Sequence, residues 1–337
     1  MGCSASAENV KLPSSQSPKY YIGVDFGGTN ISAGVVNHRH EIIKTHSVKT
    51  LSQRQPKLII ADMAELIRTV TKMANLDFEK DVAWVGIGAP GTINGVDGVV
   101  EYSNNINWFD VPLGPELKKD LNKPIFMDND ANAAAYGEYL EGSAKGSKIF
   151  VMMTLGTGVG GGIIINNKIF TGFNSAGAEL GHKVIILDGR QCTCGRKGCL
   201  EAYASATGII SLTKEIMNEN KDSLMWDLVE NDIEKVTGQT CFDAREKGDE
   251  AGKKVTEQFI RYLACGVTDI INVFQPDLLS IGGGISAQGD WLINEVKALV
   301  AEQVFTKFSK NNTKIIKASL GNDAGILGAA LLGKTSE

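Results

Sequence analysis

One histidine and three cysteines follow one another in a pattern that suits a bound metal ion. His182 is followed by Cys192, Cys194 and Cys199, which together offer one imidazole and three thiolates. Structural zinc is held tetrahedrally by such sets, and four protein ligands leave no position open for a reacting water. The sequence therefore predicts a structural zinc site at these residues. The alternative is three reduced cysteines that hold no metal.

A carboxylate followed by a tight glycine turn occurs near the start of the chain. Asp25 ends an apolar run and leads into Gly27, Gly28, Thr29 and Asn30. A turn without Cβ atoms lets backbone N–H groups surround an anion, and the Thr and Asn side chains add donors. Asp25 would orient a hydrated Mg²⁺ beside that anion. The alternative is an ordinary hairpin turn, in which two glycines are common.

A second glycine turn repeats the first in the middle of the chain. Five of the seven residues from Gly156 to Gly162 are glycine. So many glycines lower the stability of a fold, and a plain turn rarely needs them. We expect Thr157 and Gly158 to face the first loop and to grip the same polyphosphate. The GxGxxG spacings at 86–91 and 156–161 are not read as dinucleotide sites, because no helix pattern follows either of them.

Four of the five residues from Asp128 to Asn132 are Asp or Asn. They lie between a short apolar run and an Ala-rich helical pattern, so one of them is expected to cap the helix. Capping needs only one such residue. Because α/β folds place functional groups at the ends of strands, facing a cleft, this segment predicts a general base.

The hydrophobic pattern supplies alternating strands and helices that would position these segments. Strands are expected at 20–24, 31–36, 82–87, 125–127, 278–281 and 314–316, and helices at 57–74, 131–140, 249–274 and 324–332. The stretch 20–39 also aligns with 149–168, each reading as strand, glycine turn and strand. This echo predicts a duplicated α/β architecture, with one glycine turn per domain and a cleft between the domains.

Composition excludes several classes of protein. The chain has 337 residues, enough for about two domains. Its net charge of −5 argues against general nucleic-acid binding, and it has no apolar run long enough to span a membrane. The six cysteines are not spaced like a secreted disulfide framework, so we expect a reducing, cytoplasmic environment. Residues 1–19 read as a disordered tail, in which Gly2 and Cys3 match a lipidation pattern.

Together these motifs resemble the ROK family (repressor, open reading frame, kinase) of sugar kinases and regulators, from Tyr21 to Gly333. The resemblance implies a two-domain actin-like ATPase (RNase H-like) fold of the α/β class. The smaller domain would contain 20–127 plus 322–337. The larger one would contain 128–321, with the loop of the predicted zinc ligands from His182 to Cys199, called the zinc loop below. Ala178 departs from the family pattern, which usually has glycine before the sugar-binding Glu.

The resemblance also implies a role for each matching residue, with ATP, Mg²⁺ and a structural Zn²⁺ as cofactors. Asp130, in NDAN at 129–132, would be the catalytic base. The sugar would be bound by Asn104, Asn105, Asn129, Glu179, His182 and Glu201. The ATP phosphates and the adenosine side would contact Asp25, Gly27, Gly28, Thr29, Asn30, Thr157, Gly158, Gly282, Gly283 and Gly284.

Within the family, NNINW at 104–108 looks most like the glucokinases, which implies phosphoryl transfer to the 6-hydroxyl of glucose. The stretch 91–107 is polar and offers no apolar recess for an N-acetyl group. N-acetylmannosamine kinases, fructokinases, polyphosphate as donor and a non-catalytic sugar sensor stay open as alternatives. Only 24 residues precede Asp25, which is too few for the helix-turn-helix of family repressors. Since family members are commonly dimers, we expect a homodimer.

Overall fold

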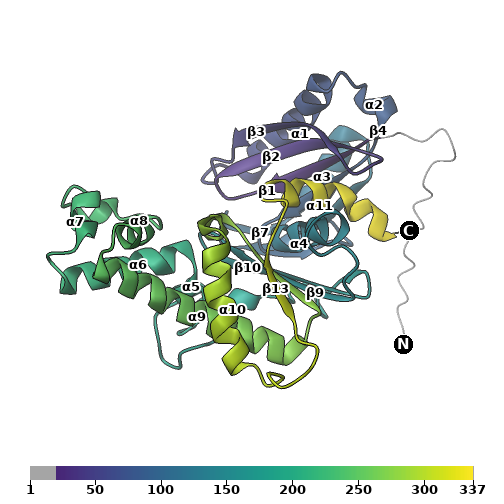
Figure 1. Ribbon diagram of the computed structural model, residues 1–337. Coiled ribbons are helices and arrows are strands. Elements are labelled where there is room, and N and C mark those ends of the chain that lie inside the picture. The colour runs from purple at the N-terminus through teal and green to yellow at the C-terminus, as the bar shows by residue number, and fades with distance from the viewer. Residues whose placement is uncertain (1–19, 337) are drawn as a thin grey trace.

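The computed structural model describes residues 20–336, which form two five-stranded sheets with helices around them (Figure 1). The first sheet has the strand order β3-β2-β1-β4-β8. Its first three strands are antiparallel, and β4 and β8 continue it in parallel. Its strands are β1 (Tyr20–Phe26), β2 (Asn30–Asn37), β3 (Ile42–Lys49), β4 (Val82–Ala89) and β8 (Ile125–Asn129).

The second sheet repeats the first in its topology. Its order is β11-β10-β9-β12-β13, again with an antiparallel hairpin that is extended by two parallel strands. Its strands are β9 (Ile149–Leu155), β10 (Val159–Ile165), β11 (Lys168–Ile169), β12 (Leu278–Gly282) and β13 (Lys314–Lys317). Because β9 and β10 occupy the places of β1 and β2, the expected duplication is confirmed.

Two helices, α4 (Asp130–Glu141) and α11 (Asp323–Leu331), lie between the two sheets (Figure 1). They approach each other closely: a Cβ added at Gly328 would lie 1.7 Å from the carbonyl oxygen of Ala133. α11 lies equally close to the first sheet, and the indole N–H of Trp84 donates to the carbonyl of Ala330 at 2.8 Å. Small residues on these elements therefore allow backbones to pack directly against one another.

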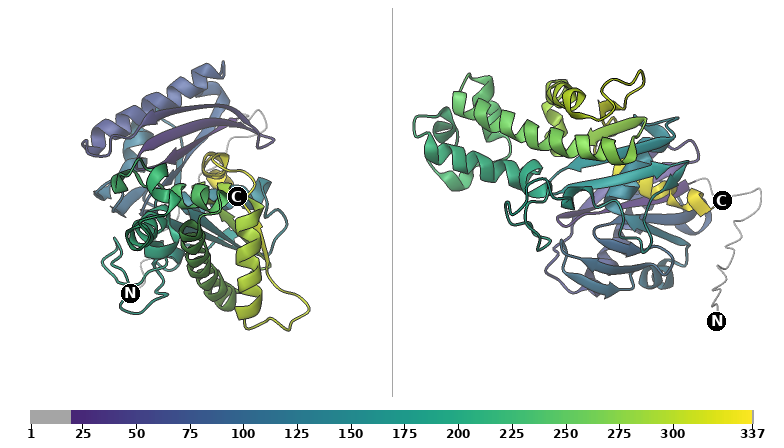
Figure 2. Two further views of the ribbon diagram at one scale, coloured as in Figure 1. Left: turned by 60° about the vertical axis from the view of Figure 1, so that its left-hand side comes forward. Right: turned by 90° about the horizontal axis from the view of Figure 1, so that it is seen from below.

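The remaining helices cover the outer faces of both sheets and build a lobe on the second. α1 (Pro56–Met73) presents a continuous buried face to the first sheet, joined by α2 (Phe78–Asp81) and α3 (Leu113–Leu121). Figure 2 shows the lobe extending from the second sheet. It contains α5 (Glu201–Ala204), α6 (Ala206–Glu219), α7 (Leu224–Leu228) and α8 (Thr240–Glu246), and beside it run α9 (Glu250–Phe274) and α10 (Asp290–Gln303).

A small third sheet, which was not expected, follows β4. It consists of β5 (Thr92–Asn94), β6 (Val99–Ser103) and β7 (Trp108–Val111). The buried indole of Trp108 packs on Phe26, with ring centroids 5.2 Å apart, which anchors this sheet beside the first glycine turn. The loop between β6 and β7, which contains Asn104 and Asn105, is thereby fixed in place.

Every strand and helix expected from the hydrophobic pattern is present, with ends that differ by at most a few residues. The expected tail, with Gly2 and Cys3, lies outside the described residues. The exact division into 20–127 plus 322–337 and 128–321 stays a prediction. Among residues 20–336, no helix is both long and apolar enough to cross a membrane.

Candidate active site

A cleft of about 650 Å³ brings both halves of the chain together. Its walls include the end of β1, the start of α4, the second glycine loop and the zinc loop. Among the predicted site residues, the cleft is lined by Asp25, Asn104, Asn105, Asn129, Asp130, Thr157, Gly158, Glu179, His182, Glu201 and Gly283. Segments up to 300 residues apart in the sequence thus meet around one space.

Three carboxylates lie at one edge of the first sheet because parallel strands end there together. Asp25 on β1 is level with Gly88 on β4, which is level with Asp128 on β8. Asp130 follows directly as the first residue of α4. A Cβ at Gly88 would lie 3.3 Å from the Cα of Asp130, so a glycine there lets α4 begin against the sheet.

Burial governs the charge of these carboxylates. Burial, and secondarily the neighbouring Asp130, raise the pKa of Asp25 to about 6. Burial also raises the pKa of Asp130, although the N–H of Ala131 opposes this by donating to its Oδ1 at 2.9 Å. A bound cation would reverse both shifts, because it favours the ionised form. The pair therefore suits a site that combines a base with a divalent cation.

Asn129 is the residue that caps α4. Its Oδ1 accepts hydrogen bonds from the N–H groups of Ala131 and Asn132, at 2.9 and 3.3 Å. Its Nδ2 donates to the carbonyl oxygen of Gly91 at 3.0 Å. Both ends of this side chain thus have protein partners, and its main task here is to fix the start of α4. Its predicted contact with a sugar stays a prediction.

A chain of hydrogen bonds connects the start of α6 to the backbone of the second glycine loop. The N–H of Gly208 donates to the hydroxyl oxygen of Ser205 at 3.0 Å, which leaves the Ser205 proton for Thr207, 2.8 Å away. Thr207 then donates to the carbonyl oxygen of Thr157 at 3.0 Å. Beside it, the N–H of Ala206 donates to the carbonyl of Gly156 at 2.8 Å. The sequence analysis missed this chain, which the Ser-x-Thr before a helical pattern could have indicated.

The three consecutive glycines of this loop, Gly160 to Gly162, allow close packing, which the sequence interpretation did not anticipate. A Cβ at Gly162 would lie 2.4 Å from that of Ala135 on α4, and one at Gly161 would lie 2.5 Å from Leu180. Their missing side chains allow α4 and the segment before His182 to lie directly on β10. Only the first part of the loop, with Thr157 and Gly158, combines cleft exposure with a turn.

The first glycine loop borders an adjoining hollow of about 510 Å³ instead of the main cleft. Gly27, Gly28, Thr29 and Asn30 all line this hollow, which shares Asp25 and Asn322 with the cleft. The N–H of Gly27 donates to the carbonyl of Asn30 at 2.9 Å, so the loop closes as a hairpin turn. The two glycine loops therefore face adjoining spaces, which meet at Asp25 and Asn322.

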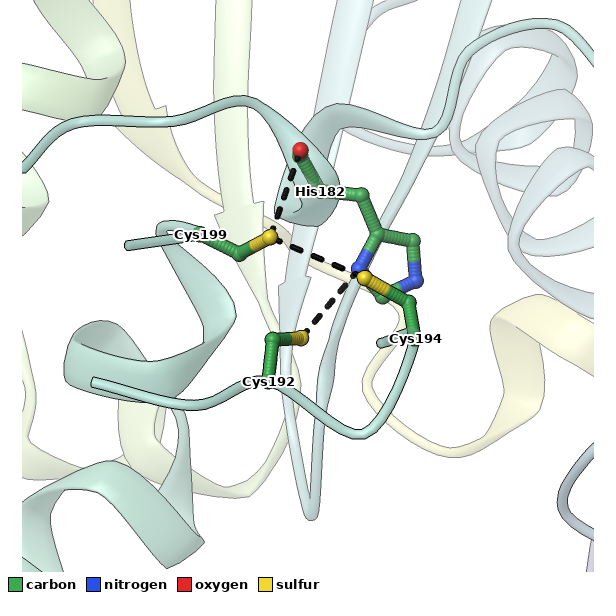
Figure 3. Close-up of side chains that lie close together, drawn as sticks. All are labelled: His182, Cys192, Cys194 and Cys199. Carbon is green, nitrogen blue, oxygen red and sulfur yellow. Dashed lines mark hydrogen bonds between the residues drawn. The ribbon is translucent and has the colours of Figure 1, made fainter. Parts of the chain in front are cut away.

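The predicted metal ligands do come together (Figure 3). The ligand atoms of His182, Cys192, Cys194 and Cys199 all lie within 4.8 Å of one another. The sulfurs of Cys194 and Cys199 are 3.7 Å apart, and that of Cys192 is 3.7 Å from Nδ1 of His182. Zinc–sulfur bonds of about 2.3 Å in a tetrahedron place sulfurs about 3.8 Å apart, so the set fits this ion. Nε2 stays on the other side of the imidazole (Figure 3).

The zinc loop carries a carboxylate to the second glycine loop. Glu201, the first residue of α5, accepts the N–H of Val159 with Oε2 at 2.9 Å and the hydroxyl of Thr193 with Oε1 at 3.3 Å. The pKa of Glu179 is raised, mainly by burial. The nearby His182 lowers this pKa, whereas the carboxylates of Asp130 and Glu201 raise it further. These four groups are therefore within electrostatic reach of one another at one end of the cleft.

Two predictions about the cleft walls are only partly met. Of Gly282, Gly283 and Gly284, only Gly283 lines the cleft, where its φ of +81° and close approach to Leu155 require glycine. The wall from 91 to 107 also contains an aromatic ring, since Tyr102 lines the cleft beside Asn104. Whether this wall offers an apolar recess for an N-acetyl group stays a prediction.

Comparison with known proteins places this site in a family. A model described as the ROK family matches residues 21–336. The chain belongs to the ROK family. Its relatives include a glucokinase of Thermotoga maritima, 37% identical over 310 residues that cover 92% of this chain and 95% of that protein. ROK members with another activity are similar too: a xylose repressor of Bacillus spizizenii is 29% identical over 95% of this chain, which spans 78% of the repressor.

A solved ROK structure confirms the expected fold. The glucokinase of Streptomyces griseus, in complex with glucose and AMPPNP, superposes with a TM-score of 0.82 at 31% identity. The match covers 94% of this chain and 99% of that one. The chain therefore has the two-domain actin-like ATPase fold of the ROK glucokinases.

Proposed function

We propose that this protein is an ATP-dependent glucokinase that phosphorylates the 6-hydroxyl of glucose. The observation that carries the proposal is the position of Asp130, which lines one cleft together with Glu179, His182, Glu201 and the second glycine loop. It is supported by relatives named glucokinase that are 37% and 34% identical to this chain, and by the Streptomyces griseus glucokinase, which holds glucose and AMPPNP in the same fold.

Asp130 acts as the base in this proposal. Its carboxylate accepts the proton of the 6-hydroxyl as that oxygen attacks the γ-phosphorus in line, and the bond from the γ-phosphorus to the β–γ bridging oxygen breaks to release ADP. Since phosphoryl transfer has a loose transition state, positioning and charge neutralisation matter more than a strong base. The cap formed by Asn129 fixes the start of α4, and with it the direction of the Asp130 side chain.

Carboxylates and amides hold the sugar. Glu179 and Glu201 accept hydrogen bonds from its hydroxyl groups, and Asn104, Asn105 and Nε2 of His182 add donors and acceptors. Buried carboxylates that a substrate leaves unpaired are costly, which is the basis of selectivity here. Thr157 and Gly158 hold the phosphates from the larger half, while Gly28 and Thr29 approach from the hollow beside Asp25.

Two metal ions fit the residues present. His182, Cys192, Cys194 and Cys199 would hold a structural Zn²⁺, since their spacing matches a tetrahedral site. Asp25 would orient a hydrated Mg²⁺, which neutralises charge on the β- and γ-phosphates. The raised pKa of Asp25 supports this assignment, because its environment is short of positive charge.

A panel of sugars tests the assignment. With ATP, we expect the specificity constant for glucose to exceed those for N-acetylmannosamine, mannose and fructose. An equal or higher specificity constant for N-acetylmannosamine would reduce the proposal to a hexose kinase. N-acetylmannosamine is the second candidate substrate, because the aromatic ring of Tyr102 on the cleft wall could contact its N-acetyl group. Glucose binding without turnover, with either ATP or polyphosphate, would instead indicate a sugar sensor.

The substitution Asp130→Asn separates chemistry from binding. It removes the proton acceptor but keeps the size of the side chain, so we expect turnover to fall by about 10²–10⁴. Glucose affinity, followed by calorimetry, should change by less than about tenfold. Asp110→Asn, on the exposed face of the small third sheet, is the matched control. Turnover of D130N within a few-fold of the unmodified protein would show that Asp130 is not the base.

Two further properties belong to this proposal. A homodimer is supported by the family resemblance, and sedimentation of the full chain measures it. A cytoplasmic location is supported by cysteines that form no disulfide framework, five of which are free thiols in the described part of the chain. Fractionation of the source cells tests the location.

A further inference from the structure

The loop between α10 and β13 exposes two aromatic side chains. Phe305 and Phe308 are 89% and 91% exposed. The N–H of Phe305 donates to Oδ1 of Asn272 at 2.9 Å, which places the loop beside Val273, itself 74% exposed. Figures 1 and 2 show this loop at the end of the molecule far from the first sheet. Large apolar side chains that gather in this way on a surface mark an interaction site.

The same region carries positive charge, although the whole chain is acidic. Residues 297–317 contain five lysines and one glutamate, against a net charge of −5 for the protein. Among residues 20–336, no carboxylate forms an ion pair with Lys297, Lys307, Lys310 or Lys314. Nζ of Lys297 donates to Oδ1 of Asn294 at 3.4 Å, and Nζ of Lys307 lies 5.4 Å from the ring centroid of Phe308. These ammonium groups are available to an anionic partner.

A hollow of about 450 Å³ lies directly beneath this loop. Its floor is apolar, with Ile271, Val300 and Ile315, and three of the lysines, Lys297, Lys307 and Lys314, stand around it. No residue from 297 to 317 lines the catalytic cleft, so an occupant of this hollow would leave the cleft open.

We propose that this face docks on an anionic lipid bilayer. Phe305 and Phe308 enter the interfacial region, where aromatic rings are stable, while the lysines contact lipid phosphates and the hollow receives a headgroup. A second copy of the chain fits this face poorly, because a two-fold interface would bring unpaired lysines against the same lysines. The docking face is defined here as Val273 and residues 297–317.

The start of the sequence supports the same partner. Met1-Gly2-Cys3 with Ser6 matches a pattern for acylation, on residues outside those that the structure describes. A single acyl chain gives only marginal membrane binding, and a basic patch is the usual second signal.

Sedimentation of the full, unacylated chain with lipid vesicles tests the docking face alone. We expect binding to vesicles with about one quarter phosphatidylserine, none to pure phosphatidylcholine, and weaker binding as salt rises. The double variants Phe305→Ser with Phe308→Ser and Lys307→Gln with Lys310→Gln should each bind at least about tenfold more weakly. Matched controls are Leu58→Ser with Val96→Ser, and Lys72→Gln with Lys118→Gln, all exposed on other faces.

Three results would overturn the proposal. The first is equal binding to neutral and anionic vesicles, and the second is unchanged binding of both loop variants. The third is a dimer of the unmodified protein that the double variant F305S with F308S dissociates, because this face would then be a subunit interface. Sugar phosphorylation by the loop variants in solution should equal that of the unmodified protein. That readout shows that they are folded and keeps this inference separate from the proposed activity.

Discussion

Ala178 shows how one methyl group can strain a binding site. It lies directly before Glu179 and has a φ of +64°, in the left-handed region that favours glycine. An alanine there costs about 1 kcal/mol or more. The ROK pattern usually has glycine at this place, so this chain carries strain next to a proposed sugar ligand.

The substitution Ala178→Gly should therefore raise the free energy of unfolding by about 1 kcal/mol, because it relieves that strain. Denaturant unfolding measures the change. Ala176→Gly is the matched control: Ala176 is not among the described residues with positive φ, so glycine there should lower stability by about 0.5–1 kcal/mol. Equal effects of the two variants would contradict this account.

Asp25 links the pH dependence of stability to the site. Burial and Asp130 raise its pKa from 3.8 to about 6, so the folded protein holds this proton more tightly than the unfolded chain. The resulting stabilisation is complete below pH 3.8 and is lost as the pH rises through about 6. At neutral pH without Mg²⁺, the ionised Asp25 therefore destabilises the fold.

We expect Asp25→Asn to stabilise the Mg²⁺-free protein by on the order of 2 kcal/mol near pH 7.5, and by little near pH 4. Urea unfolding at the two pH values measures the difference. The same variant should lose most sugar phosphorylation, since its amide orients hydrated Mg²⁺ poorly. Asp222→Asn, at an exposed position, should change neither property. A stability gain that is equal at both pH values would contradict the pKa explanation.

At the scale of elements, the start of α6 supports the second glycine loop. Thr207→Val keeps the shape of the side chain and removes the donor to the carbonyl of Thr157. One such hydrogen bond is worth about 1 kcal/mol, so we expect the KM for ATP to rise about fivefold while the KM for sugar changes little. Initial-rate kinetics with each substrate varied in turn measures both constants.

Thr207→Ser should restore the KM for ATP, because it returns the hydroxyl. Ser211→Ala is the control on the same helix, since its hydroxyl donates to the carbonyl of Thr207 and not to the loop. If both KM values rise together in T207V, the hydrogen bond stabilises the fold and does not position the loop.

The zinc loop supports the sugar side in the same manner. Cys194→Ser removes one thiolate from a set that begins at His182 and runs into Glu201. We expect loss of the zinc ion, by elemental analysis, and a rise in the sugar KM of at least about tenfold. Cys265→Ser, outside the set, should keep both. Zinc-free protein with full activity would refute the coupling.

At the scale of the whole molecule, repetition and long apolar patterns made the fold predictable. The repeated hairpin predicted a duplicated architecture, and the amphipathic pattern of α9 located that helix almost to the residue. The edge strand β3 was not anticipated, because its side chains are mostly exposed and show no apolar alternation. The small third sheet was missed for a similar reason, since its short strands are too brief for a clear pattern.

The site was predictable in its residues and less so in its geometry. Motifs pointed to Asp130, the second glycine loop and a His/Cys set, and the structure brings residues of all three to one cleft. They could not show that Gly161 and Gly162 are needed for the close approach of Leu180 and α4, because that depends on segments distant in sequence. Nor could they show that the first loop borders its own hollow, which forms where the first three strands meet the start of α11.

The place of α11 has a consequence for synthesis on the ribosome. All residues of α11 from Ala324 to Leu331 are buried, and the helix covers β1 and β4. At about 5–20 residues per second, roughly 15–60 s separate the emergence of β1 from that of α11. The first sheet to be translated thus waits, with an uncovered apolar face, for nearly the last helix. Nascent chains of this protein should therefore remain clients of chaperones until translation ends.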